Sequence, residues 1–318
     1  MKCLDIGSRG GFVEDLLPMA FAVDAVGFEA DKAECDKMNK LTSEMEIPWR
    51  SLKYLPIALG KNKKKQSLNI YSNRGCSSLL EADVELAESF SRGDYYQLEK
   101  TVEIETVSLD KVAEKYNLTD AVYMKIDVQG SEMDIINNGK QLLKNRILVV
   151  RIEVMFYPFY INQCTFKDLD GSLRDLGFIP MMFLEQHHWR RTTKVKLPLL
   201  SEGQFPYSRG QLMHGDVLYF KDPDIMPDGT SEEIEILLKA SFIALAYGYV
   251  DHSLFIMQRP SVKEYLASKY DIVPEKMLGD VSRYFAALHL KKKWRLLLSD
   301  FKSQLKQSIG LFLAGKRK

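Results

Sequence analysis

A glycine-rich turn follows directly on the first apolar segment of the chain, and it narrows the range of folds more than any other feature. The apolar segment Cys3–Ile6 predicts a buried strand, and Gly7, Gly10 and Gly11 come after it. Glycines let the backbone turn tightly and let a ligand approach without meeting a Cβ atom. The pattern of Gly11–Met19 predicts a helix after the turn. Together these segments indicate the first unit of a nucleotide-binding α/β sheet.

Apolar segments continue to alternate with helical patterns, such as Asp31–Leu41, along the first two thirds of the chain. The further strands that we expect are Val23–Phe28, Leu55–Leu59, Ala121–Ile126, Ile147–Val154 and Met213–Phe220. This alternation predicts an α/β protein with a Rossmann-like, doubly wound, mostly parallel seven-stranded sheet. The ligand of such a sheet binds at the C-terminal ends of its strands.

The segment Asp222–Thr230, which contains two prolines and a glycine, marks a domain boundary. We expect a Rossmann-like domain over residues 1–222 and a helical extension over 223–318. Nine basic residues and one acidic residue between Lys291 and Lys318 give this tail a formal charge of +8, so the rest of the chain carries −7. A mildly acidic body with a basic tail does not indicate a nucleic-acid-binding protein.

The tail also carries an apolar stripe at helical spacing, formed by Trp294, Leu298, Phe301, Leu305, Ile309 and Phe312. Two interpretations stay open. A basic amphipathic helix suits peripheral contact with an anionic membrane or a lipid-linked substrate through residues 291–318. The same stripe also suits a terminal helix that packs on the domain.

Cysteine usage and hydropathy bear on the compartment. The chain has four cysteines, and none forms a C-x-x-C pair, which argues against a disulfide framework and against a zinc knuckle. No apolar run reaches the roughly 18–20 residues that span a bilayer, and the first residues lack the apolar core of a secretory signal. We therefore expect a cytoplasmic protein, with peripheral contact at a membrane if the tail provides it.

Two acidic residues near the glycine turn favour a particular ligand. Asp5 precedes Gly7 by two positions, where its carboxylate would repel the pyrophosphate of a dinucleotide. The ammonium and sulfonium groups of S-adenosylmethionine would instead be attracted. Glu29 ends the second predicted strand, where an acid can accept hydrogen bonds from ribose hydroxyls. An NAD-type oxidoreductase is the alternative, and Asp5 and the absence of a G-x-G-x-x-G motif disfavour it.

Further charged side chains fall at strand ends. Asp127 follows the strand Ala121–Ile126 at the expected catalytic edge, and Ser131 is placed to cap a helix that begins at Glu132. Glu153 lies with Arg151 in an otherwise apolar strand, where a charge is costly unless it is paired or used.

These residues belong to a longer set of matching stretches. The chain resembles the FkbM-type S-adenosylmethionine-dependent methyltransferases, a class I Rossmann-like family, over roughly its first 220 residues. The stretches that carry the resemblance are DIGSRGG at Asp5–Gly11, VGFEAD at Val26–Asp31, PIALG at Pro56–Gly60, GCSSLLEAD at Gly75–Asp83, and the long block Val102–Gly139 with its KIDVQGSE core. Val149–Val154 and Gly215–Phe220 continue the match more weakly.

The resemblance implies an S-adenosylmethionine-dependent O-methyltransferase that acts on a hydroxyl of a sugar, glycan or polyketide-type acceptor. It implies cofactor binding by Asp5, Gly7, Ser8, Gly10 and Glu29, with Ala58 near the adenine and Asp127 where cofactor and acceptor meet. The chain departs from the family pattern in two stretches of this site. Ser8-Arg9 replaces the usual Ala-Asn, and Gln129 replaces the usual acid before Gly130. These departures leave a degenerate, non-catalytic Rossmann module as a second alternative.

Methylation of a hydroxyl calls for a general base, because a hydroxyl is weakly acidic. The candidate bases are Asp127, Glu153, His187, His188 and His214. His187 and His188 fall in the polar stretch Glu185–Thr193, which we expect to be a loop near the strand ends. A divalent metal between Asp127 and Glu153 would need more oxygen ligands than the sequence places there, so no metal site is assigned.

Overall fold

A computed structural model describes residues 1–193, 210–284 and 286–294. The chain divides into two units, Met1–Met226 and Pro227–Lys318, and each is described separately below.

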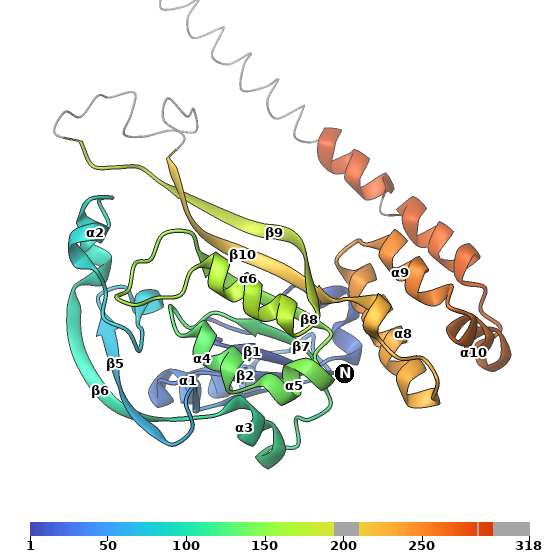
Figure 1. Cartoon of the computed structure of the whole chain (residues 1–318), viewed down its shortest axis with the longest axis horizontal. Helices are drawn as coiled ribbons and strands as arrows, with labels where there is room; N and C mark the ends of the chain where they lie inside the picture. Colours follow the sequence, from blue (N-terminus) through green and yellow to red (C-terminus); the bar gives the residue numbers. More distant parts are fainter. Residues whose placement is uncertain (194–209, 285, 295–318) are drawn as a thin grey trace, which may run out of the picture. The chain divides into compact units, whose positions relative to one another are not determined.

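The first unit is built on a seven-stranded sheet (Figure 1). Its strands, in spatial order, are β3 (Ser51–Leu55), β2 (Asp24–Phe28), β1 (Lys2–Ile6), β7 (Ala121–Ile126), β8 (Val149–Met155), β10 (Gln211–Lys221) and β9 (Phe178–Trp189). β10 runs antiparallel to both of its neighbours, and the other pairs of this sheet are parallel. The predicted doubly wound, mostly parallel seven-stranded sheet is therefore confirmed. Strand order reverses between β1 and β7, where such sheets bind ligands.

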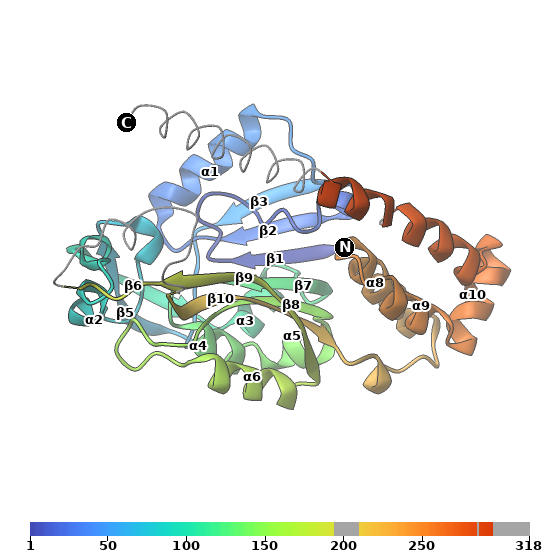
Figure 2. The same cartoon turned by 90° about the horizontal axis from the view of Figure 1, so that it is seen from above.

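One face of this sheet forms the main core of the unit. Alternate residues of the strands, such as Leu4, Val26 and Ile126, are buried against four helices. These are α3 (Leu109–Lys115), α4 (Glu132–Asn137), α5 (Lys140–Asn145) and α6 (Phe166–Asp175). Figure 2 shows α4, α5 and α6 together on one side of the strands. The parallel strands are thus held rigidly, and their C-terminal ends are fixed relative to one another.

The predicted helix Gly11–Met19 is wrong. The chain after the glycine turn is irregular until a short 3₁₀ helix, η1 (Leu17–Ala22). Gly10 and Gly11 have φ values of +88° and +133°, which a right-handed helix does not accommodate. Pro18, the second residue of the 3₁₀ helix, lacks an N–H group.

Helix α1 (Lys32–Glu44) begins where the sequence predicts it. Asp31 is its N-cap, and the carboxylate accepts hydrogen bonds from the backbone N–H groups of Ala33 and Glu34. Cys35 and Met38 of this helix pack against Tyr54 of β3.

The predicted strand Leu55–Leu59 is divided between two sheets. β3 ends at Leu55, and β4 (Ala58–Leu59) pairs with β6 (Leu98–Val107) in a separate three-stranded sheet, which β5 (Lys64–Tyr71) completes. Pro56 separates the two strands and has no N–H group for a ladder hydrogen bond. Three short helices, η2 (Arg74–Cys76), α2 (Val84–Glu88) and η3 (Gly93–Tyr96), connect β5 to β6.

The expected loop Glu185–Thr193 is also wrong over most of its length. β9 continues to Trp189 because β10 pairs with it along its whole length. A Cβ atom at Gly215 of β10 would lie 2.2 Å from the carbonyl oxygen of Glu185, so a glycine permits this close pairing. His187 and His188 are consecutive strand residues, and their side chains point to opposite faces.

The second unit is helical where it is described. It contains α8 (Ser231–Ala246), α9 (Val250–Met257) and α10 (Pro260–Tyr270), and residues 274–284 and 286–294 are also helical. Within the described residues, no helix combines the length and the apolar character needed to cross a membrane. The apolar stripe of the tail beyond Trp294 lies outside the described residues.

Candidate functional site

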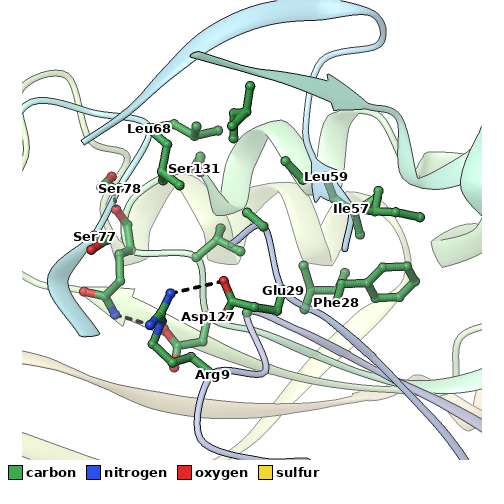
Figure 3. A pocket seen from close by; sticks show the side chains of 18 of the residues that line it. Arg9, Phe28, Glu29, Ile57, Leu59, Leu68, Ser77, Ser78, Asp127 and Ser131 are labelled. Carbon is green, nitrogen blue, oxygen red and sulfur yellow. Dashed lines mark hydrogen bonds and ion pairs between the residues drawn. The ribbon is translucent and has the colours of Figure 1, made fainter. Parts of the chain in front are cut away.

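A cavity of about 200 Å³ opens at the C-terminal ends of β1, β2 and β7. The small second sheet and the segment 74–79 close its other side. Of the residues singled out for a cofactor, Gly7, Glu29, Ala58 and Asp127 line this cavity (Figure 3).

The glycine turn is packed tightly against the end of β7. Gly7 has φ +84°, and a Cβ atom there would lie 1.8 Å from the carbonyl oxygen of Asp127. The N–H groups of Gly7 and Ser8 both donate to the carbonyl of Phe28, at 3.0 and 3.1 Å. Only glycine fits at position 7, and this turn therefore joins the ends of three strands.

One end of the cavity is apolar. Phe28, Ile57 and Leu59 gather there, and Leu68 lies nearer Ser78 and Ser131, as Figure 3 shows; Ala58 also lines the cavity. These side chains come from β2, β4, β5 and the connection before β4. An apolar slot of this kind suits a flat aromatic ring.

Glu29 lies between this apolar end and the glycine turn. It is 6% exposed, and its Oε1 atom accepts a 2.8 Å hydrogen bond from the N–H of Asp31. Burial raises its pKa. A guanidinium nitrogen of Arg9 lies 3.4 Å from the same oxygen.

Asp5 lies beneath the turn and does not line the cavity. It is 1% exposed, and its Oδ2 atom accepts a 2.8 Å hydrogen bond from the N–H of Val13. Burial raises its pKa to about 6, and the ammonium of Lys125, 3.8 Å away, opposes that rise. Its carboxylate therefore holds the loop that follows the turn. Ser8 and Gly10 likewise lie outside the cavity wall.

Asp127 and Glu153 are joined through Gln129. The Nε2 atom of Gln129 donates to Asp127 at 2.9 Å and to Glu153 at 2.6 Å. Burial alone would raise the pKa of Asp127, but the ammonium of Lys125, 3.1 Å away, and the Gln129 amide lower it overall. Burial and the nearby Asp127 raise the pKa of Glu153 well above its ordinary value. The two carboxyl groups therefore differ in ionisation, with Asp127 the ionised one.

A histidine extends this chain of contacts. His214 Nδ1 lies 3.1 Å from Glu153, and burial lowers its pKa to about 4. A protonated Glu153 can therefore donate to a neutral His214. The ring of His187 stacks on that of His214 at 4.3 Å, so this predicted histidine lies near the site. His188, on the other face of β9, is not brought to it.

Of the other predicted polar residues, Arg151 has structural partners, whereas the buried hydroxyl of Ser131 has no hydrogen-bond partner among the described residues. Arg151 forms ion pairs with Asp15 at 2.7 Å and with Asp216 at 2.5 Å. Ser131 begins α4 as expected, but its side chain makes no capping bond. The carboxylate of Glu132 accepts hydrogen bonds from the N–H groups of Val128 and Gly130 instead. Within the described residues, no group of three or more His, Cys, Asp or Glu is arranged to hold a metal ion.

Sequence reasoning treated Gln129 only as a departure from a pattern and did not consider Lys125. The signal that could have pointed to Gln129 is its position directly before Gly130. Residues at such turns can adopt a positive φ, and Gln129 has a φ of +57°. Lys125 lies two residues before Asp127, and side chains two residues apart in a strand point to the same face of the sheet. The sequence alone therefore predicts that the two side chains are neighbours. Tyr160, which lies 3.3 Å from the Gln129 amide oxygen, had no sequence signal.

Comparison with known families agrees with this geometry. The model of the methyltransferase FkbM domain matches residues 5–180, a region that includes the cavity and the three residues Asp127, Gln129 and Glu153. Among curated proteins, none matches the chain.

Proposed function

Because the chain belongs to the FkbM methyltransferase family, whose domain spans residues 5–180, we propose that it binds S-adenosylmethionine and methylates a hydroxyl group. We favour a sugar or glycan-type acceptor, and a polyketide-type hydroxyl is the alternative acceptor class. The observation that carries the proposal is the sequence of groups along one cavity. An apolar slot, a strand-end acid, a glycine turn and an ionised carboxylate follow one another from Phe28 to Asp127.

The residues present fit the cofactor. The apolar slot of Phe28, Ile57 and Leu59 suits the adenine, and Glu29 is placed for the ribose hydroxyls. Gly7 leaves room where a side chain would collide with the end of β7. When bound, S-adenosylmethionine supplies a methyl group on a positively charged sulfur, so that the C–S bond breaks as the new C–O bond forms.

Asp127 is the residue best placed to act on the acceptor. Its side chain is 29% exposed, it lines the cavity, and its lowered pKa keeps it ionised near neutral pH. It can orient an acceptor hydroxyl and accept the proton from it. Glu153 accepts a hydrogen bond from Gln129, and His214 contacts Glu153 behind it, so we assign both a positioning role.

Two partly exposed aromatic rings, Trp189 and Tyr157, lie close to His214 outside the cavity wall and support a sugar-type acceptor, whereas Phe159 behind Trp189 is buried. The Trp189 ring lies 5.6 Å from that of His214 and 4.4 Å from that of Phe159. Tyr157, which is 36% exposed, follows β8 nearby. Aromatic rings offer a large apolar surface with few rotatable bonds, which suits the C–H face of a sugar ring.

Calorimetry with S-adenosylhomocysteine and a radiolabelled methyl-transfer screen over glycans and polyketide alcohols test the proposal. Asp127→Asn keeps the shape and removes the charge, so we expect affinity to change less than about threefold and turnover to fall roughly 10²–10⁴-fold. His188→Asn, on the opposite face of β9, is the matched control and should leave both unchanged. Absence of binding to the wild-type protein would reject the cofactor, and equal turnover in Asp127→Asn would reject the catalytic role. Binding without turnover on any acceptor would favour the degenerate module.

A further inference from the structure

Arg9 lies in the cavity and contacts Glu29, the same carboxylate that the ribose of a bound nucleoside would use. Its Nη2 atom is 3.4 Å from Glu29 and 3.3 Å from Asp31, and its side chain is 27% exposed. Figure 3 shows the guanidinium beside Asp127 and directed at Glu29. Charge-assisted hydrogen bonds are usually about 2.7–2.9 Å long, so both contacts are loose. Arg9 can therefore leave Glu29 at little cost.

The small volume of the cavity also indicates that the Arg9 side chain moves when a ligand binds. Sites for drug-sized ligands usually measure roughly 300–1,000 Å³, whereas this cavity holds about 200 Å³ with Arg9 in it. Displacement of the Arg9 side chain would enlarge the cavity and would free Glu29 to accept hydrogen bonds from ribose hydroxyls.

The charges that line the cavity indicate where Arg9 would go. Its acidic residues are Glu29 and Asp127, and its basic residues are Arg9 and Arg74. The methionyl end of the proposed cofactor carries a carboxylate, which the two acids would repel unless a cation met it. Arg74 is engaged by Glu99 at 2.5 Å, and both side chains are 45% exposed. Arg9 belongs to the glycine turn itself, next to Asp127, which makes it the available cation.

We propose that Arg9 moves from Glu29 to the carboxylate of the cofactor's methionyl group and thereby selects ligands that carry this carboxylate. The inference rests on the proposed function. It gives a role to a residue at which the chain departs from the usual family pattern, in which asparagine occupies this position.

A pair of ligands isolates the effect. S-adenosylhomocysteine has the carboxylate, whereas 5′-methylthioadenosine has the same nucleoside and a thioether without the amino-acid end. We expect Arg9→Asn to weaken S-adenosylhomocysteine binding at least tenfold in calorimetry, and to leave 5′-methylthioadenosine binding unchanged or a few-fold tighter. Arg9→Lys keeps the charge and should retain much of the preference. Arg74→Asn is the matched control and should not alter the ratio of the two affinities.

Three results would decide against the inference. Equal weakening of both ligands by Arg9→Asn would place Arg9 at the nucleoside or in the fold. Unchanged affinity of Arg9→Asn for both ligands would exclude the carboxylate contact. A selective loss in Arg74→Asn would assign the contact to that residue. Failure of the wild-type protein to bind either nucleoside would be a different outcome, because it would reject the proposed function itself.

Discussion

Replacement of Gln129 by glutamate introduces the acid that the family usually carries at this position. In this chain the change would be disruptive, because the Nε2 atom of Gln129 donates to Asp127 at 2.9 Å and to Glu153 at 2.6 Å. A glutamate has no N–H group there, so it would bring a third carboxyl group against two others. Its φ would stay at +57° whichever side chain is present, so backbone strain does not distinguish glutamate from glutamine.

The expected cost follows from the two lost hydrogen bonds. One bond goes to an ionised carboxylate, worth roughly 1.5–3 kcal/mol, and one goes to a protonated carboxyl group, worth roughly 0.5–1.5 kcal/mol. Gln129→Glu should therefore lower the free energy of unfolding by about 2–4 kcal/mol at pH 8. The new carboxyl group faces Asp127, so its folded pKa lies above its unfolded value of about 4.3. A raised folded pKa gives stability that is present at low pH and lost as pH rises. The deficit should shrink near pH 5, because the protonated glutamate can donate one of the two hydrogen bonds and no longer repels Asp127.

Urea unfolding followed by tryptophan fluorescence, at pH 5 and at pH 8, measures this difference. Gln129→Met is the matched control, because it loses both hydrogen bonds and cannot ionise, so its deficit should not depend on pH. A glutamate variant as stable as the wild type at pH 8 would show that the amide does not bridge the two acids. A deficit that stays constant from pH 8 to pH 5 would show that no carboxyl repulsion is involved.

Two further substitutions test the frame of the cavity. Gly7→Ala places a Cβ atom 1.8 Å from the Asp127 carbonyl, whereas a Cβ atom at Gly10 meets nothing within 4 Å. Gly10→Ala still carries the backbone strain of a φ of +88°, so it should lower the melting temperature moderately. Only Gly7→Ala should abolish S-adenosylhomocysteine binding in calorimetry, with a steeper fall in melting temperature. Glu132 has a pKa raised to about 7 by burial, so its contribution to stability is full below its unfolded value and is lost as pH rises through 7. Glu132→Gln should therefore stabilise the protein by up to roughly 3 kcal/mol at pH 8 and by little at pH 5, as measured by urea unfolding. A gain of equal size at both pH values would show that ionisation of the buried Glu132 is not the cause.

The buried parallel strands were predictable from the sequence because their apolar runs have no other stable environment. Ala121–Ile126 was predicted with the bounds that the structure gives, and it lies at the centre of the sheet. Cavity residues at strand ends, such as Glu29 and Asp127, were predictable for the same reason: a strand that is buried on both faces fixes where the first polar residue emerges.

The errors arise where local pattern and tertiary contacts disagree. Gly11–Met19 has helical periodicity, yet the buried carboxylate of Asp5 accepts the N–H of Val13 and draws this stretch into an irregular loop. Glu185–Trp189 is polar because β9 lies at the edge of the sheet, where strand residues are exposed, and polarity alone made it resemble a loop. In each case the deciding partner lies outside the stretch whose pattern was misleading: Asp5 is eight residues from Val13, and β10 pairs with β9.

The position of Lys125 explains why Asp5 matters although it lies outside the cavity. Asp5 and Lys125 are partners in the β1–β7 register, and the ammonium lies 3.8 Å from Asp5 and 3.1 Å from Asp127. One cation therefore balances the acid that holds the loop after the glycine turn and also the acid that faces the acceptor. Gln129 completes the charge balance at this edge, because its amide donates two hydrogen bonds and adds no charge. A third acid there would exceed what Lys125 can balance. The glutamine is therefore consistent with a site adjusted to its own lysine rather than with one that has decayed.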